Sequence, residues 1–199
     1  MKSMKGAGTT SGERTARDIN LKIVIVAVLV LTILIWLIPA IPVSLLGAFI
    51  IVVFGFFFAT VSSRMVGLVG SSNNPISGMS IATLLIATVI LKVTGADGIT
   101  GMSSAIAIGS IICIVSAIAG DTSQDLKTGY ILGATPRKQQ IGEIIGVVAA
   151  ALAIGGTLYL LDSAWGFGSE ELGAPQATLM KLIIEGVMGG NLPWPLVFT

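Results

Sequence analysis

The chain has 199 residues, of which 54% are hydrophobic and 11% are charged, and its formal net charge is +1. A soluble domain of this length needs a more polar surface, so water is not the main solvent of this protein, and the near-neutral charge argues against a nucleic-acid partner. Histidine is absent, and the single cysteine, Cys113, cannot form a disulfide within the chain. We therefore expect no metal site and no cofactor. Any proton transfer near neutral pH would have to use carboxylates.

The first 20 residues are polar, contain several Gly and Ser residues, and carry basic side chains, which predicts a flexible cytoplasmic lead-in. An apolar run over 21–41 follows and is long enough to cross a bilayer, which takes roughly 20 residues. A cleaved signal peptide is the alternative interpretation. Its apolar core usually has about 7 to 15 residues, and no small-x-small cleavage site follows here. The run therefore predicts a first membrane span.

Pro39 and Pro42 lie at the end of this run. Each lacks an amide donor and crowds the preceding turn, so we expect the chain to bend there. A second span is expected over 43–61. A polar stretch over 62–75, rich in Gly, Ser and Asn near its end, predicts a loop.

The next apolar run, residues 76–91, is short for a full crossing and begins with Ser77 and Gly78, so a tilted, broken or re-entrant helix is expected. Spans four and five are expected over 99–120 and 141–161. Small residues recur in both spans, and they let helices approach closely in lipid. The predicted fold class is therefore all-α, a polytopic transmembrane helical protein with about five spans.

The segment 162–199 is mixed in polarity and contains an amphipathic piece over 177–187, which is too short and too charged for an ordinary span. We expect a short interfacial or re-entrant helix there, in an extracytoplasmic or re-entrant segment that looks truncated. The chain thus divides into the lead-in 1–20, a transmembrane region 21–161 with a polar cytoplasmic loop over 121–140, and this last segment.

The basic residues predict the orientation of the spans. If five runs cross and the N-terminus is cytoplasmic, nine of the eleven Lys and Arg residues lie inside, and Lys92 and Lys181 lie outside. Cytoplasmic loops carry an excess of basic residues in membrane proteins, so this orientation is favoured. We therefore expect a multi-pass protein of the cell membrane, surrounded by lipid, with its N-terminus in the cytoplasm.

The most unusual stretch runs over 120–130, immediately beyond the fourth apolar run. It holds Asp121 and Asp125, four residues apart, together with Gln124 and Lys127. If the stretch is helical, the two carboxylates share a face and could bind a cation or share a proton. The plain alternative is a solvated cytoplasmic loop with helix-capping residues.

Two further places could carry chemistry. At Asn74–Pro75, a proline opens a helix after Asn, and Ser77 and Gly78 follow, which exposes backbone amides as in the half-helix termini of many transporters. A plain helix cap is the alternative there. Glu143 lies near the start of the fifth span, where an ionisable residue is either functional and paired or close enough to the interface to stay wetted.

Several motifs stand in a fixed order along the chain: Asn74-Pro75-Ile76-Ser77-Gly78-Met79, Gly120-Asp121 through Gln124-Asp125-Leu126-Lys127-Thr128-Gly129-Tyr130, Thr135-Pro136-Arg137 leading to Ile145-Gly146, and Ala174-Pro175-Gln176-Ala177 with Gly186-Val187 and Leu192-Pro193. In this order and spacing they resemble the oligopeptide transporter superfamily, and the prokaryotic relatives of its yellow stripe-like branch are the most similar. The resemblance implies that five residues of these motifs have a structural role: Pro75, Gly78, Gly129, Pro136 and Pro175.

The resemblance implies secondary active transport of oligopeptides or peptide-like metal chelates, with proton symport as the driving reaction. Members of the family are several times longer, so we expect this chain to be a fragment whose partners are the remaining helices of the same transporter and a small peptide or metal-chelate substrate. A homo-oligomer is left open. The candidates for substrate binding or coupling are Asn74, Ser77, Asp121, Gln124, Asp125, Lys127 and Glu143.

Two other classes of function are weighed against transport. A small non-catalytic membrane subunit would only pack against partner helices, and the truncated appearance keeps this alternative open. An intramembrane enzyme would use the aspartates to hold Mg²⁺. The sequence disfavours the enzyme, because it offers no second acidic cluster and no histidine or nucleophile near the first.

Overall fold

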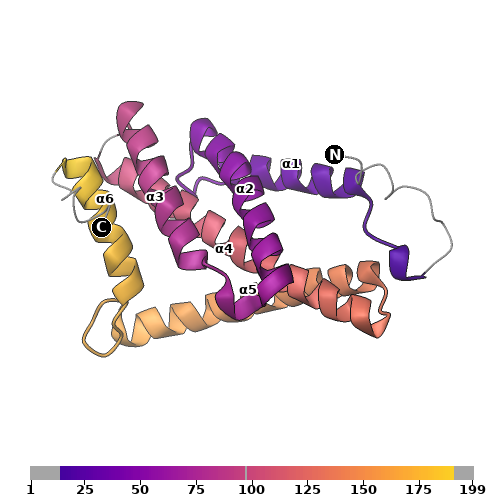
Figure 1. Ribbon diagram of the computed structural model, residues 1–199. Helices are drawn as coiled ribbons and strands as arrows, with labels where there is room; N and C mark the ends of the chain where they lie inside the picture. The colour runs from indigo at the N-terminus through magenta and orange to yellow at the C-terminus, as the bar shows by residue number, and fades with distance from the viewer. Residues whose placement is uncertain (1–13, 97, 191–199) are drawn as a thin grey trace.

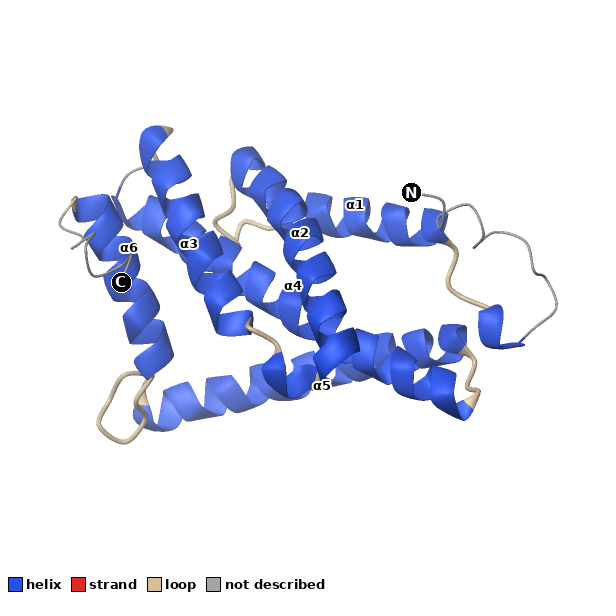
Figure 2. Ribbon diagram, in the orientation of Figure 1, coloured by secondary structure: helices blue, strands red, loops and turns tan. Residues whose placement is uncertain are grey.

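Figure 1 shows a computed structural model, which describes residues 14–96 and 98–190. Every regular element within these ranges is helical and none is a strand, which confirms the predicted all-α class (Figure 2). The first five α-helices are long and apolar enough to cross a membrane. The α-helices are α1 (Leu21–Leu37), α2 (Leu45–Val69), α3 (Ile76–Val93), α4 (Gly98–Leu132), α5 (Pro136–Trp165) and α6 (Pro175–Gly189).

The bend predicted at Pro39 and Pro42 separates α1 from α2. Ile38, which precedes the first proline, has an extended backbone (φ −77°, ψ 113°), as the steric demand of the proline ring requires. α2 begins after Ser44, whose Oγ accepts a hydrogen bond from the Gly47 amide at 3.2 Å. The chain therefore forms two capped helices here.

α2 continues to Val69, beyond the expected end at residue 61, so the first part of the loop predicted over 62–75 is helical. The helix ends at Gly70, whose φ of 105° lies in the region that glycine reaches without strain. A short 3₁₀ turn, η2 (Ser71–Asn73), then leads to α3. Because α3 is one continuous helix of 18 residues, the broken form considered for this segment is wrong.

The polar loop predicted over 121–140 is also largely helical. α4 extends for 35 residues, and only residues 133–135 separate it from α5. Gly133 forms this turn with a φ of 72°, and Pro136 opens α5 at a position where the missing amide donor leaves no helical bond unmade. We expected a loop because the polar side chains of this stretch are typical of a solvent-exposed segment. In the structure, several of them form hydrogen bonds to neighbouring helices instead. Its cytoplasmic location stays a prediction.

The core lies where α4 packs against α2 and α3. Ala105, Ile108 and Ile112 of α4 are completely buried there. Gly109 lets α3 approach closely, because a Cβ at this position would lie only 2.9 Å from Leu84 Cδ1. Small residues thus bring these helices together, as expected for packing in lipid.

α1 and α5 flank this core and contain no buried residue. In Figure 1, α5 runs across the lower ends of α2 and α3 on its way to α6. A Cβ added at Gly142 or Gly146 of α5 would meet no atom within 4 Å. The apolar surfaces of both helices are therefore open to lipid or to further helices.

α6 packs on α3 and α4 through its buried residues Ile184 and Val187. Lys92, in the last turn of α3, donates a hydrogen bond to the carbonyl oxygen of Val187 at 2.8 Å. The C-terminal ends of α3 and α6 therefore lie together and the two helices run in the same direction (Figure 1). A helix is present where the amphipathic piece predicted one, and its depth in a membrane stays a prediction.

Candidate substrate and coupling site

A row of serine hydroxyls joins the second half of α2 to α4, and we call it the α2–α4 polar seam. Ser62 Oγ donates to the Ser116 carbonyl oxygen at 2.6 Å, and Ser63 Oγ donates to the Ala119 carbonyl oxygen at 3.1 Å. Ser123 Oγ donates in the reverse direction, to the Ser63 carbonyl oxygen at 2.8 Å. Interhelical bonds of this kind stabilise helix pairs in lipid by about 0.6 to 2 kcal/mol each.

Two candidate residues, Gln124 and Lys127, extend the seam. Gln124 Oε1 accepts a hydrogen bond from the Ser71 amide at 2.7 Å, and Lys127 Nζ donates to the Gly67 carbonyl oxygen at 2.5 Å. Gly67 belongs to the last turn of α2, where carbonyls lack helical partners and a cation is favourable. Both side chains therefore fix the end of α2 and the turn that follows it.

Asn74 lies against the buried end of this seam. Its Nδ2 donates to Ser62 Oγ at 2.8 Å and lies 3.4 Å from the Ser116 carbonyl oxygen. Its Oδ1 and Ser116 Oγ are buried without a hydrogen-bond partner among the described residues. Gly120 makes room for the amide, because a Cβ there would lie 2.5 Å from Asn74 Nδ2 and 3.0 Å from Ser62 Oγ. Asn74 thus ties the turn before α3 to both neighbouring helices.

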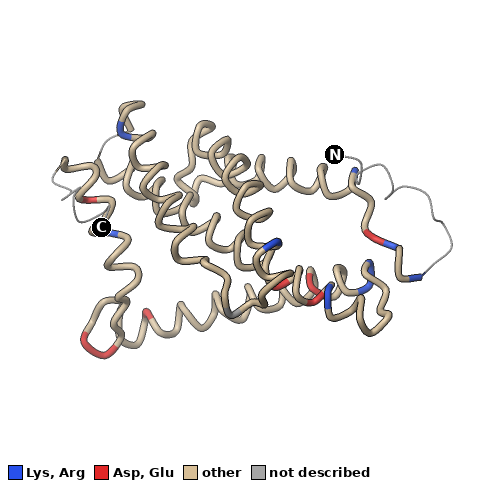
Figure 3. Tube along the Cα trace, viewed as in Figure 1, with Lys and Arg blue, Asp and Glu red and all other residues tan. Residues whose placement is uncertain are grey.

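A second polar group forms where α4 meets α5. Thr122 Oγ1 donates to Glu143 Oε2 at 2.8 Å. Gln139 Nε2 donates to both the carbonyl oxygen and Oδ2 of Asp125, each at 3.1 Å. Gly129 admits the Gln139 side chain, because any Cβ at this position would overlap it. α4 and α5 are therefore joined by acids and amides, and acidic positions gather at this junction in Figure 3.

The junction has the composition expected of a proton site, because carboxyl and amide groups meet there. Asp121 and Asp125 lie one turn apart on α4, as a helical stretch requires, and Thr122, which lies between them in sequence, donates to Glu143 of α5. Glu143 Oε1 and Gln139 Oε1 are buried acceptors that have no donor among the described residues. Protonating one carboxyl group would supply a donor and reduce the repulsion between neighbouring carboxylates. An added proton would therefore meet buried acceptors at this junction.

The other motif residues do not join these groups. Ser77 is exposed in the first turn of α3, and a Cβ at Gly78 would meet no atom within 4 Å. Pro75 occupies the N-cap position of α3. The structure thus brings Asn74 to the seam, while the side of the helix start that carries Ser77 stays open.

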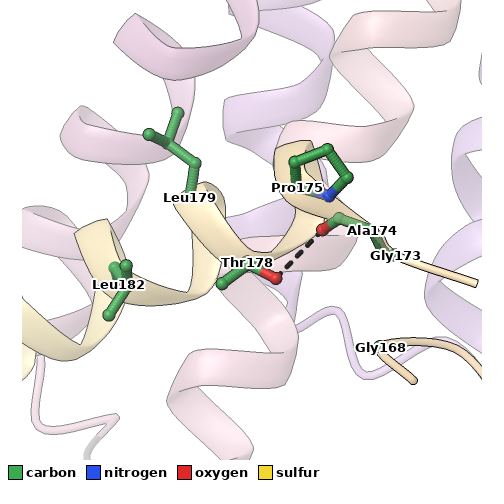
Figure 4. Close-up of a pocket in the computed structure, with 7 residues that line it drawn as sticks. All are labelled: Gly168, Gly173, Ala174, Pro175, Thr178, Leu179 and Leu182. Carbon is green, nitrogen blue, oxygen red and sulfur yellow. Dashed lines mark hydrogen bonds between the residues drawn. The ribbon is translucent and has the colours of Figure 1, made fainter. Parts of the chain in front are cut away.

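Pro175 lies at the start of α6, away from the junction of α4 and α5 (Figure 1), beside an open depression of about 400 Å³. Figure 4 shows this depression, where Thr178 Oγ1 donates to the Ala174 carbonyl oxygen at 3.0 Å. The lining is mostly apolar and glycine-rich and consists of Gly168, Gly173, Ala174, Pro175, Thr178, Leu179 and Leu182. The described lining contains no charged group that could bind a cation or a carboxylate.

Several residues of the site were not singled out from sequence. Ser62 and Ser63 follow an apolar run and looked like the start of a loop, and Ser116 lies unremarked within the fourth run. Gln139 was missed too, although it stands one helical turn before Glu143 and could have been paired with it on that spacing. Within residues 14–96 and 98–190, no three His, Cys, Asp or Glu side chains converge as metal ligands.

Together these features define a multi-pass α-helical membrane protein whose core helices are joined by polar contacts near one end. The sequence matches the family of OPT oligopeptide transporter proteins over residues 4–199, and the chain belongs to that family. The resemblance seen in the motifs is thereby confirmed.

Several curated proteins are similar to the chain. It is 38% identical over 170 residues to a Haemophilus influenzae protein named as an oligopeptide transporter, a match that covers 76% of this chain and 27% of the relative. It is 31% identical over 122 residues to the Saccharomyces cerevisiae oligopeptide transporter YGL114W, covering 60% of this chain and 16% of the relative. It is 32% identical over 106 residues to the rice metal-nicotianamine transporter YSL5, covering 51% of this chain and 15% of the relative.

The chain spans less than a third of the length of these curated relatives. All of them are named as transporters and none as an enzyme, in agreement with the class predicted from the motifs. No solved structure matches the chain.

Proposed function

We propose that this chain forms part of a secondary active transporter that moves oligopeptides or peptide-like metal chelates, coupled to protons. Membership of the OPT family over residues 4–199 carries the proposal. The relatives are named for oligopeptides in two cases and for metal-nicotianamine in a third, so a small peptide or a chelated metal is the substrate class. The remaining helices of the same transporter complete the substrate pathway.

Asp121, Asp125 and Glu143 are the proposed coupling residues. They lie where two helices of membrane-spanning length meet, and protonation of one carboxyl would relieve repulsion between neighbouring carboxylates. A proton bound there changes the hydrogen bonds that join α4 to α5, which is how its uptake would be linked to movement of these helices. Asn74 and Ser77, at the start of α3, are placed to meet polar groups of the substrate.

Gln124 and Lys127 act as positioning residues in this proposal. Their bonds to the backbone of Ser71 and Gly67 hold the turn before α3 against α4. We place this end of the helices in the cytoplasm, with the N-terminus, in the cell membrane. The lead-in from Arg14 and the start of α5 lie together at this end, which supports a common cytoplasmic side for their basic residues.

The test is uptake by the longest reading frame that contains this sequence, reconstituted into proteoliposomes with an imposed proton gradient. Labelled dipeptides and a labelled metal-nicotianamine complex are the two substrates compared. We expect the double variant D121N/D125N to lose uphill, gradient-driven uptake while it retains exchange of substrate across the membrane. The control is D162N, which removes an acid at the far end of α5. Unchanged uphill uptake by D121N/D125N would remove these aspartates from the mechanism.

A small non-catalytic subunit is the second candidate function, and the uncovered faces of α1 and α5 favour it. Neither helix buries a residue within the described chain, so both have apolar surface available for partner helices or for a second copy. Under this alternative, the chain co-purifies with a partner protein, and D121N/D125N leaves the transport activity of that complex unchanged.

A further inference from the structure

The polar lead-in before α1 is fastened to the turn between α4 and α5. Three hydrogen bonds do this, each between residues about 120 apart in sequence: Arg14 Nη2 to the Gly133 carbonyl oxygen (2.9 Å), the Arg137 amide to the Arg17 carbonyl oxygen (2.9 Å) and the Ile19 amide to Gln140 Oε1 (3.1 Å). The start of α5 and the lead-in therefore form one continuous surface, although the sequence separates them by four helices.

This surface carries an excess of positive charge. The described ion pair, Lys181 with Glu185, belongs to α6, and none of the cations of this surface is paired with an acid among the described residues. Asp18 is the acid that lies among them, and its Oδ1 accepts a bond from Gln140 Nε2 at 3.5 Å. We call the surface the basic rim, and it consists of the exposed residues Arg14, Arg17, Lys22, Arg137 and Lys138.

The apolar helices α1 and α5 determine how deep in a bilayer the basic rim lies. Asn20 Oδ1 caps α1 by accepting a bond from the Lys22 amide at 3.0 Å, and an exposed apolar helix begins at that point. On α5, the exposed apolar surface begins at Ile141, one turn after Arg137 and Lys138. Helices of this length and composition place their apolar surface in the hydrocarbon layer, so cations at their first turn lie at the level of the lipid headgroups.

We propose that the basic rim binds the headgroup phosphates of anionic phospholipids. Arginine presents a planar fork of donors that fits phosphate, and lysine adds a compact cation. The bonds that hold the rim together use backbone atoms of Arg17. Within residues 14–96 and 98–190, its guanidinium group and the ammonium group of Lys138 make no hydrogen bond and are available to a ligand. A phosphate between them bridges the lead-in and α5. This lipid site goes beyond the proposed transport function and does not depend on it.

The experiment titrates phosphatidylglycerol and phosphatidylcholine onto the full chain in neutral detergent and measures lipid retention by native mass spectrometry. The variant R17Q/K138Q removes two cations without removing any described hydrogen bond. The charge-matched control R64Q/K181Q removes two cations from α2 and α6. Each cation near an anionic surface contributes roughly fivefold to binding, so the rim variant should hold phosphatidylglycerol about 25-fold more weakly.

Preferential retention of phosphatidylglycerol by the wild type, lost in R17Q/K138Q and kept in R64Q/K181Q, would support the proposal. The variant R17K/K138R keeps both charges and should keep the preference, which separates charge from any effect on folding. Equal retention of the two lipids by the wild type would overturn the proposal. So would an unchanged preference in R17Q/K138Q, or an equal loss in the control pair.

Discussion

Gly120 offers a direct test of the close packing between α2, α4 and the turn before α3. An alanine there would place its Cβ 2.5 Å from Asn74 Nδ2 and 3.0 Å from both Ser62 Oγ and Val66 Cγ2. Ser62 is fully buried and already donates to Ser116, so it has no free space into which to move. We therefore expect G120A to displace Asn74 and to break its bond to Ser62.

The expected cost follows from opposing effects. Alanine favours a helix over glycine by about 1 kcal/mol, which would stabilise α4. Overpacking a filled interior costs about 1 to 3 kcal/mol, and leaving a buried polar group unpaired costs about 1 to 3 kcal/mol more. The net loss in the free energy of unfolding is therefore about 3 kcal/mol. For a chain of this size, that corresponds to a melting temperature lower by about 6 to 12 °C.

The assay is thermal unfolding of the detergent-purified chain, followed by tryptophan fluorescence. G142A is the matched control, because a Cβ at this helical glycine of α5 would meet no atom within 4 Å and should leave the melting temperature unchanged or higher. In an N74A background, the cost of G120A should shrink, because the clashing amide is gone. A G120A protein that melts at or above the temperature of G142A would refute this account of the packing.

Two further predictions concern the contacts at the ends of the helices. We expect K92M to free the C-terminal end of α6, because it removes the bond to the Val187 carbonyl oxygen and a favourable cation, and hydrogen exchange in residues 175–189 should become faster. We expect G129A to expel the side chain of Gln139 and so to break its bonds to Asp125, which should loosen α5 from α4 and increase the distance between spin labels on the two helices.

Each of these predictions has a matched control. K181M removes a lysine of α6 itself, but the ion pair of Lys181 is exposed and contributes little, so exchange in the C-terminal turn should stay slow. G146A, on the open face of α5, should leave the spin-label distances unchanged. Equal exchange rates in K92M and K181M, or equal distances in G129A and G146A, would contradict the contacts described.

Much of the helical pattern could be predicted from the sequence because lipid imposes simple rules on it. An apolar run such as 21–41 has to form a helix where it crosses a bilayer, since only helices and closed barrels satisfy their backbone there, and α1 covers residues 21–37 of it. The pair Pro39 and Pro42 has a local steric effect that needs no tertiary context, and the break appears as expected. The predicted helix ends were wrong where polar residues follow an apolar run. We expected ends at residues 61 and 120, but α2 continues to Val69 and α4 to Leu132.

The site was harder to predict, because its bonds join residues that are distant in sequence. Ser62 bonds to a carbonyl 54 residues away, and a serine hydroxyl carries no sequence signal that identifies such a partner. The pairing of Asp121 and Asp125 on one helical face could be anticipated from their spacing. The bonds of Thr122 to Glu143 and of Asp125 to Gln139 required the packing of α5 against α4.

The sequence by itself determined that the chain lies in lipid, that it is helical and to which family it belongs, because hydropathy and ordered motifs are properties of short stretches. Tertiary structure decided which polar residues meet. It turned the stretch 121–132 into a helix that bonds to α2 and α5, and it joined the lead-in to the start of α5. The physical reason is that a hydrogen bond in an apolar surrounding needs a partner at about 3 Å, and only the packed helices bring such partners within that distance.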